Sequence, residues 1–219
     1  MSITSKIQEY RQKLPEYVTL VAVSKTKPVS DLEEAYHAGQ RVFGENKIQE
    51  MVEKWEVLPK DISWHMIGHV QRNKVKYMAE FVDLIHGVDN FKLVKEIDKQ
   101  AKKYDRVINC LLQIKIAEED SKFGMSAEEA TNLLSSEEFQ QLENINIVGL
   151  MGMATFTNDM KKVRSEFKYL KKTLNSLQAT YPNLEVISMG MSGDYEVAIE
   201  EGSTMVRIGS SIFGTRNYH

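Results

Sequence analysis

A lysine follows the first apolar run of the chain, where its amine could do chemistry. Lys25 comes two residues after Val23 and four after Val21, so the three side chains share one side of an extended strand. Burial disfavours the ammonium form and lowers the pKa of a lysine, which supplies the neutral amine that reacts with an aldehyde. The sequence therefore indicates Lys25 as a candidate imine-forming residue, with a solvated loop lysine as the alternative.

Two segments rich in glycine and serine could bind a phosphate group. Ser192-Gly193 stands at the start of an expected helix, and Gly209-Ser210-Ser211 follows the last apolar run. Glycine lets backbone N–H groups approach an anion, and a serine hydroxyl adds a donor. The same residues are common in turns, which is the alternative for each segment taken alone.

Arg207 is a charged residue inside an apolar run, MVRIG. An arginine keeps its charge when buried, so it must find acceptors or an anion. We expect it to face either a ligand or a structural carboxylate. A metal site is not expected, because Cys110 is the only cysteine and the strand-like context of His65 and His69 spoils the helical zinc geometry.

The elements that must position these residues can be predicted from hydrophobic patterning. Eight short apolar runs recur at residues 18–24, 41–44, 63–68, 81–88, 107–116, 145–153, 185–191 and 205–209. Their near-continuous apolarity is typical of parallel strands covered on both faces. Amphipathic segments long enough for a helix lie between most of them, including 32–39, 46–54, 90–104, 125–134 and 159–179.

This alternation predicts an α/β fold, a single (β/α)8 barrel of the TIM type over residues 1–219. In such a barrel, functional residues lie at the C-terminal ends of the strands, and the loops after strands seven and eight often bind phosphate. An open doubly wound sheet is the alternative, but neither GxGxxG nor GxxxxGK[ST] follows the first run.

Charge and hydropathy exclude several classes of protein. The 28 Lys and Arg against 31 Asp and Glu leave a formal net charge of −3, which argues against a general binder of nucleic acid or anionic membranes. The N-terminal segment has no apolar core of a secretory signal, and no apolar run approaches the roughly 20 residues that span a membrane. We therefore expect a cytoplasmic protein without nucleic-acid or membrane partners.

Six motifs resemble the pyridoxal 5′-phosphate homeostasis protein family, whose members were earlier labelled proline synthetase co-transcribed proteins. They are AVSKTKP (22–28), FGENKIQE (43–50), WHMIGHVQRNK (64–74), GLMGM (149–153), SMGMSGDYEVAI (188–199) and GSTMVRIGSSIFG (202–214). They stand in family order and cover nearly the whole chain. One departure is GHVQRNK (68–74), where family members often have proline-leucine or histidine-leucine after the glycine.

The resemblance implies one barrel domain similar to the N-terminal domain of alanine racemase and other fold-type III pyridoxal phosphate enzymes. Lys25 would form the Schiff base with the cofactor. Arg207 would face the pyridine nitrogen, and Asn46 would lie near the O3′ side of the ring. The residues implied in holding the phosphate are Ser192, Gly209 and Ser210.

The implied function is vitamin B6 homeostasis, in which the protein holds pyridoxal 5′-phosphate as a lysine aldimine with little or no catalysis. An arginine leaves the ring nitrogen unprotonated, which weakens the ring as an electron sink. Racemases of this type add a tyrosine from a separate β-domain, and this chain ends at His219, directly after the eighth expected strand. We expect a monomer that supplies the cofactor to pyridoxal phosphate-dependent apo-enzymes, with no catalytic residues of its own.

Two enzymatic alternatives remain. In a racemase or related enzyme, a barrel residue such as His65, Tyr195 or Ser121 would replace the missing base. A phosphosugar aldolase or isomerase would use Lys25 as its Schiff-base lysine and carry no chromophore.

Overall fold

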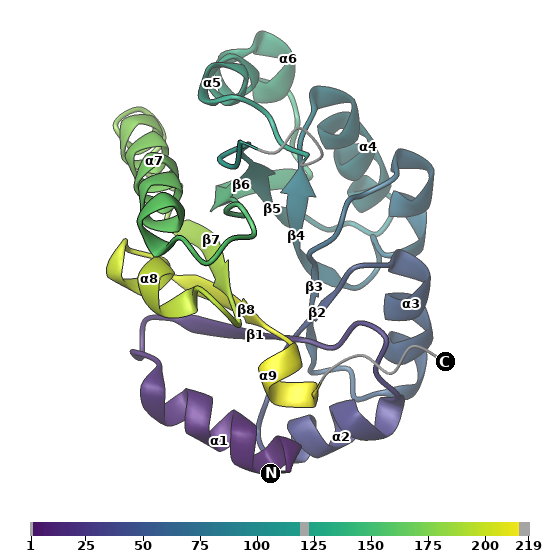
Figure 1. Ribbon diagram of the computed structural model, residues 1–219. Coiled ribbons are helices and arrows are strands. Elements are labelled where there is room, and N and C mark those ends of the chain that lie inside the picture. The colour runs from purple at the N-terminus through teal and green to yellow at the C-terminus, as the bar shows by residue number, and fades with distance from the viewer. Residues whose placement is uncertain (1, 119–122, 215–219) are drawn as a thin grey trace.

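The computed structural model describes residues 2–118 and 123–214. Its eight parallel strands close into a barrel in sequence order, with β8 paired to β1 (Figure 1). The strands are β1 (Thr19–Val23), β2 (Val42–Glu45), β3 (Ser63–Met66), β4 (Val82–Val88), β5 (Ile108–Gln113), β6 (Ile145–Met151), β7 (Val186–Met191) and β8 (Met205–Ile208). The predicted (β/α)8 barrel is confirmed, and each strand lies within one residue of a predicted apolar run.

Helices surround the barrel, and all but the first and the last connect successive strands. They are α1 (Ile3–Lys13), α2 (Val29–His37), α3 (Ile48–Val57), the 3-10 helix η1 (Arg72–Tyr77), α4 (Phe91–Lys102), α5 (Ala127–Ser135), α6 (Glu137–Gln140), α7 (Met160–Gln178), α8 (Tyr195–Glu200) and α9 (Ser210–Phe213). Among the described residues, no helix combines the length and apolarity that crossing a bilayer requires.

Two hydrophobic clusters explain the patterning of the strands. A small cluster inside the barrel contains Val21, Leu84, Leu111, Met151 and Met205. A larger one between the strands and the helices contains Phe43, Trp64 and Phe167. Since each strand buries both faces, its apolar residues run on without alternation. Each fully buried side chain of this size contributes about 1.5–3 kcal/mol to stability.

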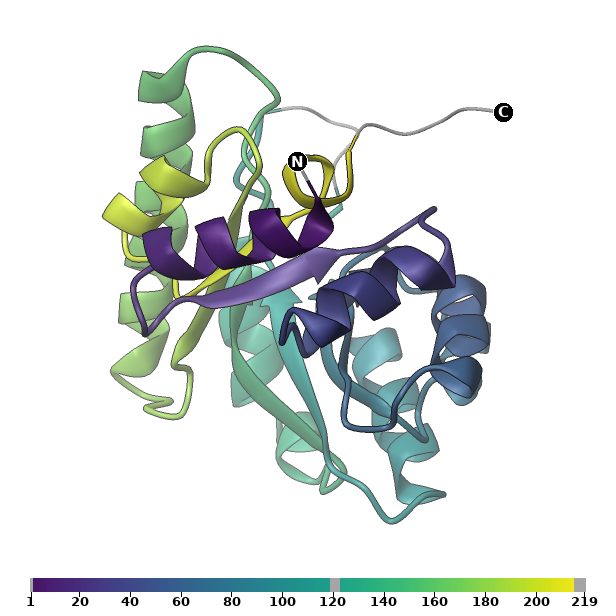
Figure 2. The same ribbon diagram turned by 90° about the horizontal axis from the view of Figure 1, so that it is seen from below.

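Local signals account for most helix boundaries. Ser126 and Glu129 form a capping box at the start of α5. Helix α2 begins at Val29, and Pro28 precedes it without a side-chain cap. Helix α1 was not predicted, because most of its side chains are polar and only Ile7 and Tyr10 are buried. Figure 2 shows α1 beside β1 and α2.

Candidate functional site

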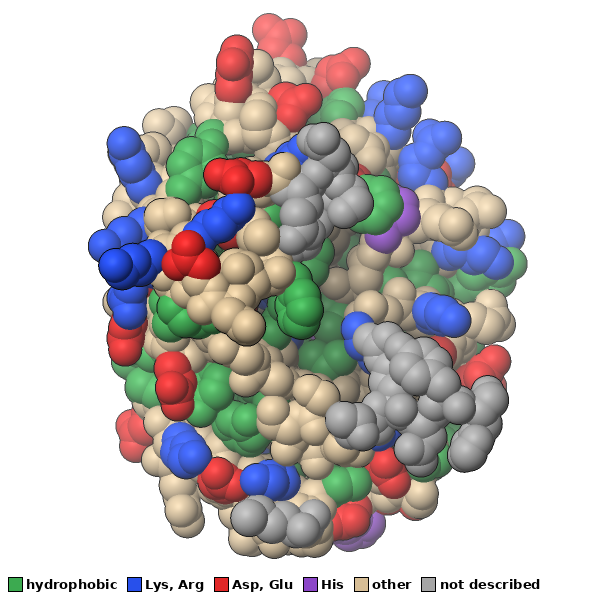
Figure 3. All heavy atoms as spheres, viewed as in Figure 1, with side chains coloured by type: hydrophobic (Ala, Val, Ile, Leu, Met, Phe, Trp, Pro, Cys, Tyr) green, Lys and Arg blue, Asp and Glu red, His purple; other side chains and the backbone are tan. Residues whose placement is uncertain are grey.

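A cavity of about 630 Å³ lies at the C-terminal end of the barrel. Its wall includes all six residues that are expected from the sequence to bind a cofactor, namely Lys25, Asn46, Ser192, Arg207, Gly209 and Ser210. Hydrophobic side chains gather around the hollow in the space-filling view (Figure 3). The exposed ones that line it are Phe123, Phe156, Met160 and Met191. The cavity therefore combines an apolar mouth with a polar wall.

Lys25 lies two residues beyond the end of β1 and lines the cavity beside Val23. The next residue, Thr26, has a φ of 64°, a left-handed conformation that is uncommon outside glycine. Glu50 of α3 accepts a hydrogen bond of 2.5 Å at Oε1 from the Thr26 N–H. The backbone that follows Lys25 is therefore anchored to α3 in this conformation.

A buried ionic network holds the backbone that precedes Lys25. Lys54 Nζ donates to Ser24 O at 2.8 Å, to Glu45 Oε1 at 2.8 Å and to Glu50 Oε1 at 2.7 Å. The Ser24 hydroxyl also donates to Glu45 Oε1, at 2.6 Å. Burial raises the pKa of Glu45, and the nearby Lys54 opposes that rise. Lys25 is thus flanked on both sides by residues tied to Lys54 or Glu50.

Asn46 follows β2 and lines the cavity next to Gly68. A side chain at residue 68 would clash with the Asn46 backbone, including its carbonyl oxygen. Glycine at this position therefore lets the loop after β3 approach the loop that carries Asn46.

The loops after β7 and β8 meet at one side of the cavity. The hydroxyl oxygens of Ser192 and Ser210 lie 3.4 Å apart. A Cβ atom added at Gly193 would meet no protein atom within 4 Å, so the space beside it is open. Together with Gly209, these residues bring hydroxyl and backbone donors to one region, an arrangement suited to an anion.

Arg207 lies on the cavity floor and is only 4% exposed. Its Nη1 donates to Ser188 Oγ at 2.6 Å, and its Nη2 donates to Gly152 O at 3.1 Å. Burial lowers its pKa to about 10, so the guanidinium stays charged at neutral pH. Among the described residues it forms no salt bridge with a carboxylate. The charge of Asp194, which also lines the cavity, opposes this lowering of the pKa.

Two further residues of the cavity were not singled out as ligands from the sequence. Gln113, at the end of β5, is buried and donates from Nε2 to Phe123 O at 2.9 Å. His69 stacks its ring on Phe123 with 4.1 Å between the centroids. Gln113 is one of the polar residues that interrupt the apolar run at 107–116, and this is the signal that could have found it.

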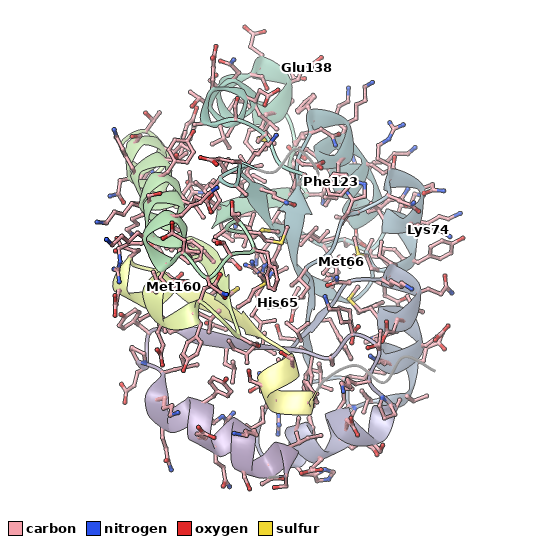
Figure 4. All side chains as sticks on the ribbon, in the orientation of Figure 1. His65, Met66, Lys74, Phe123, Glu138 and Met160 are labelled. Atoms are coloured by element: carbon pink, nitrogen blue, oxygen red, sulfur yellow. The ribbon has the colours of Figure 1, made fainter. Side chains whose placement is uncertain are left out.

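The substitute bases considered for a racemase lie elsewhere. His65 points into the barrel interior, near the centre of Figure 4, and does not line this cavity. Tyr195 packs edge-on against Tyr10 and donates to Glu196. Ser121 lies outside the described residues. Within residues 2–118 and 123–214, no group of three or more His, Cys, Asp or Glu is placed to hold a metal ion.

Comparisons with known proteins agree with this geometry. The family model described as "Alanine racemase, N-terminal domain" matches residues 1–217. The pyridoxal phosphate homeostasis protein of Vibrio alginolyticus is 41% identical, over 99% of this chain and 95% of that protein. Its counterpart in Escherichia coli (strain K12) is 38% identical, over 93% of this chain and 88% of that protein.

Solved structures show the same fold. PipY of Synechococcus elongatus PCC7942, solved with PLP bound, superposes with a TM-score of 0.88 at 34% identity, covering 97% of this chain and all of PipY. Alanine racemase from E. faecalis has a TM-score of 0.70 at 16% identity, covering 98% of this chain and 58% of the racemase, which supports the fold alone. The resemblance seen in the six motifs is confirmed, and the chain belongs to the pyridoxal phosphate homeostasis protein family.

Proposed function

We propose that this protein binds pyridoxal 5′-phosphate in the cavity at the C-terminal end of the barrel and serves its homeostasis. One observation carries the proposal: a lysine, a set of anion donors and a buried arginine line the same cavity. These groups match the aldehyde, the phosphate and the ring nitrogen of the cofactor. The family relatives, and PipY with PLP bound, support this choice.

Each part of the site has a proposed task. The Lys25 amine condenses with the cofactor aldehyde, which forms one C=N bond and releases one water. Ser192 and Ser210 donate hydroxyl hydrogen bonds to the phosphate, and the backbone at Gly209 approaches it closely. Asn46 lies on the O3′ side of the ring.

Arg207 supports a binding role with little or no catalysis. A guanidinium only donates hydrogen bonds, so it leaves the ring nitrogen unprotonated and the ring a weak electron sink. Of the residues considered as a second base, His65 and Tyr195 do not line the cavity. We therefore propose that the protein stores the reactive aldehyde and releases it to apo-enzymes. A single domain over residues 1–219, a monomeric state and a cytoplasmic location stay predictions.

The test is an absorption spectrum of the purified protein with added pyridoxal phosphate, followed by borohydride reduction and peptide mapping. We expect a visible Schiff-base band and a reduced adduct on Lys25. The Lys25→Ala variant should lose both, while Lys27→Ala should keep the band. Label scattered over exposed lysines would contradict the proposal and favour a phosphosugar barrel.

A second measurement separates storage from catalysis. The loaded protein is incubated in D2O with D- and L-amino acids, and exchange of the α-proton is followed by NMR. We expect no exchange at ordinary enzyme rates. Exchange that disappears in Lys25→Ala would instead identify a racemase or a related enzyme.

A further inference from the structure

Four buried polar side chains form a continuous chain through the barrel beneath the cavity. Arg207 Nη1 donates to Ser188 Oγ at 2.6 Å, Ser188 Oγ lies 3.0 Å from His86 Nδ1, and His86 Nε2 lies 3.1 Å from His65 Nδ1. None of the four is more than 5% exposed. Because β4 and β7 are not neighbours in the barrel, the bond between Ser188 and His86 crosses its interior.

The donor and the acceptor of each hydrogen bond in this row of side chains can be assigned, and all the donations run the same way, from Arg207 toward His65. Arg207 can only donate, and the Ser188 hydroxyl has no acceptor other than His86 among the described residues. Ser188 therefore donates to His86 Nδ1, which leaves the hydrogen of His86 on Nε2. That N–H donates to His65 Nδ1, so the hydrogen of His65 is also on Nε2.

Burial keeps both imidazoles in the neutral form that this chain requires. It lowers the pKa of His65 to about 3 and the pKa of His86 well below its usual value, which Arg207 lowers further. A protonated ring would have two donors and no acceptor, which would break the chain.

The row of hydrogen-bonded side chains ends at the opposite end of the barrel. His65 lines a second hollow of about 490 Å³ there, with Asp83 and Glu185 among the other lining residues. In Figure 4, His65 lies near the barrel axis, whereas its neighbour Met66 belongs to the outer cluster. These hydrogen-bonded side chains thus connect the cofactor cavity to the N-terminal end of the barrel.

We propose that Ser188, His86 and His65 are positioning residues that hold the Arg207 guanidinium toward the ring nitrogen of the cofactor. This inference rests on the proposed function. Within the described ranges Arg207 forms no salt bridge, and the charge of Asp194 acts on it without a hydrogen bond between them, so Ser188 Oγ and Gly152 O orient its guanidinium. Each donation along the chain polarises the next hydroxyl or imidazole, which strengthens the acceptor that Ser188 presents to Arg207.

The first test needs no cofactor, so it stands apart from the proposed function. Protein labelled with 15N-histidine is examined by long-range 1H–15N NMR at pH 7. We expect His65 and His86 to be neutral with the hydrogen on Nε2. Ser188→Ala should shift the His86 Nδ1 resonance and leave exposed His37 unchanged. A hydrogen on Nδ1 of His86, or no response to Ser188→Ala, would overturn the assignment.

The second test measures pyridoxal phosphate affinity. Removing a hydrogen bond from a charged group predicts about 10- to 100-fold weaker binding for Ser188→Ala. The matched control is Ser203→Ala, which removes another buried hydroxyl, bonded to Met189 O at 2.8 Å, without touching Arg207. Equal losses of affinity in the two variants would mean that Ser188 acts only through packing.

A pair of substitutions at one site separates polarity from volume. His86→Asn keeps an acceptor near the position of Nδ1, whereas His86→Leu removes it. We expect His86→Asn to retain most of the affinity and the wavelength of the bound cofactor, and His86→Leu to lose both. Identical behaviour of the two variants would overturn the proposal, even if Ser188→Ala fails to fold.

Discussion

Lys54 Nζ lies 2.8 Å from Glu45 Oε1, and both side chains are buried next to the loop that carries Lys25. An ion pair in such a place gains strong attraction but loses the hydration of both charges. Lys54 also donates hydrogen bonds to Ser24 O and to Glu50, and Glu50 accepts one from the Thr26 N–H. The ion pair is therefore connected to both neighbours of Lys25. The pair therefore helps to fix the position of Lys25 and also affects the stability of the fold.

Substituting one partner of this pair should strongly destabilise the folded protein. Lys54→Met leaves Glu45 buried without its cation, and we expect the free energy of unfolding to fall by about 3–5 kcal/mol. The double variant Lys54→Met/Glu45→Gln removes both charges and should recover part of that loss. Urea unfolding measures both variants. Lys13→Met is the control, because its pair with Glu9 is exposed and screened by solvent, so its loss should change stability little. A single variant as stable as the double would contradict the prediction.

The two serines at the cavity should act on the phosphate and not on the ring. Ser192→Ala and Ser210→Ala should each weaken binding of pyridoxal phosphate about 10-fold or more, since each loses a hydrogen bond to a charged group. Binding of pyridoxal, which lacks the phosphate, should be unchanged. Titrations followed by absorbance compare the two ligands, with Ser176→Ala, at an exposed position on α7, as the control. Equal losses for both ligands would place the phosphate elsewhere.

Gly193→Ala tests the open space between the same loops. The added Cβ meets no protein atom within 4 Å, so the free energy of unfolding should change by less than about 0.5 kcal/mol. Affinity for pyridoxal phosphate should nevertheless fall, because the methyl group occupies space that the phosphate needs. Thermal unfolding without ligand and a binding titration are measured on the same sample. Unchanged affinity would show that the ligand does not approach this residue.

The buried histidines should make stability depend on pH. In the unfolded chain a histidine has a pKa of about 6.5, whereas that of folded His65 is about 3. Between these two pKa values the unfolded state binds more protons than the folded state. The contribution of neutral His65 to stability is therefore fully present above about pH 6.5 and is lost as the pH falls toward 3. The expected slope is at most about 1.4 kcal/mol per pH unit for this residue.

Urea unfolding at pH 7, 6 and 5 measures this slope. The His65→Gln variant should show a shallower dependence than the wild type, because one buried titrating group has been removed. His37→Gln, at an exposed position on α2, should match the wild-type slope. Equal slopes in all three proteins would contradict the burial of a neutral His65.

The strands and most helices could be predicted because they depend on local patterning. Burial on both faces produces continuous apolar runs, and the capping box at Ser126 is readable over four residues. Helix α1 was missed because it covers the core with few apolar side chains. The order of the strands also placed Lys25, Ser192 and Ser210 at one end of the barrel, since parallel strands all end on the same side.

The sequence alone thus determined the barrel, the family and six of the residues that line the cavity. Only the tertiary structure decided what surrounds Arg207 and Lys25. Ser188 and His86 are separated by 102 residues and meet because closing the barrel brings β4 and β7 across its interior. Likewise, Lys54 reaches Ser24 only because α3 packs beside the loop after β1. Hydrophobic periodicity records which face of a strand is buried, and it contains no information on which polar side chains meet inside the closed barrel.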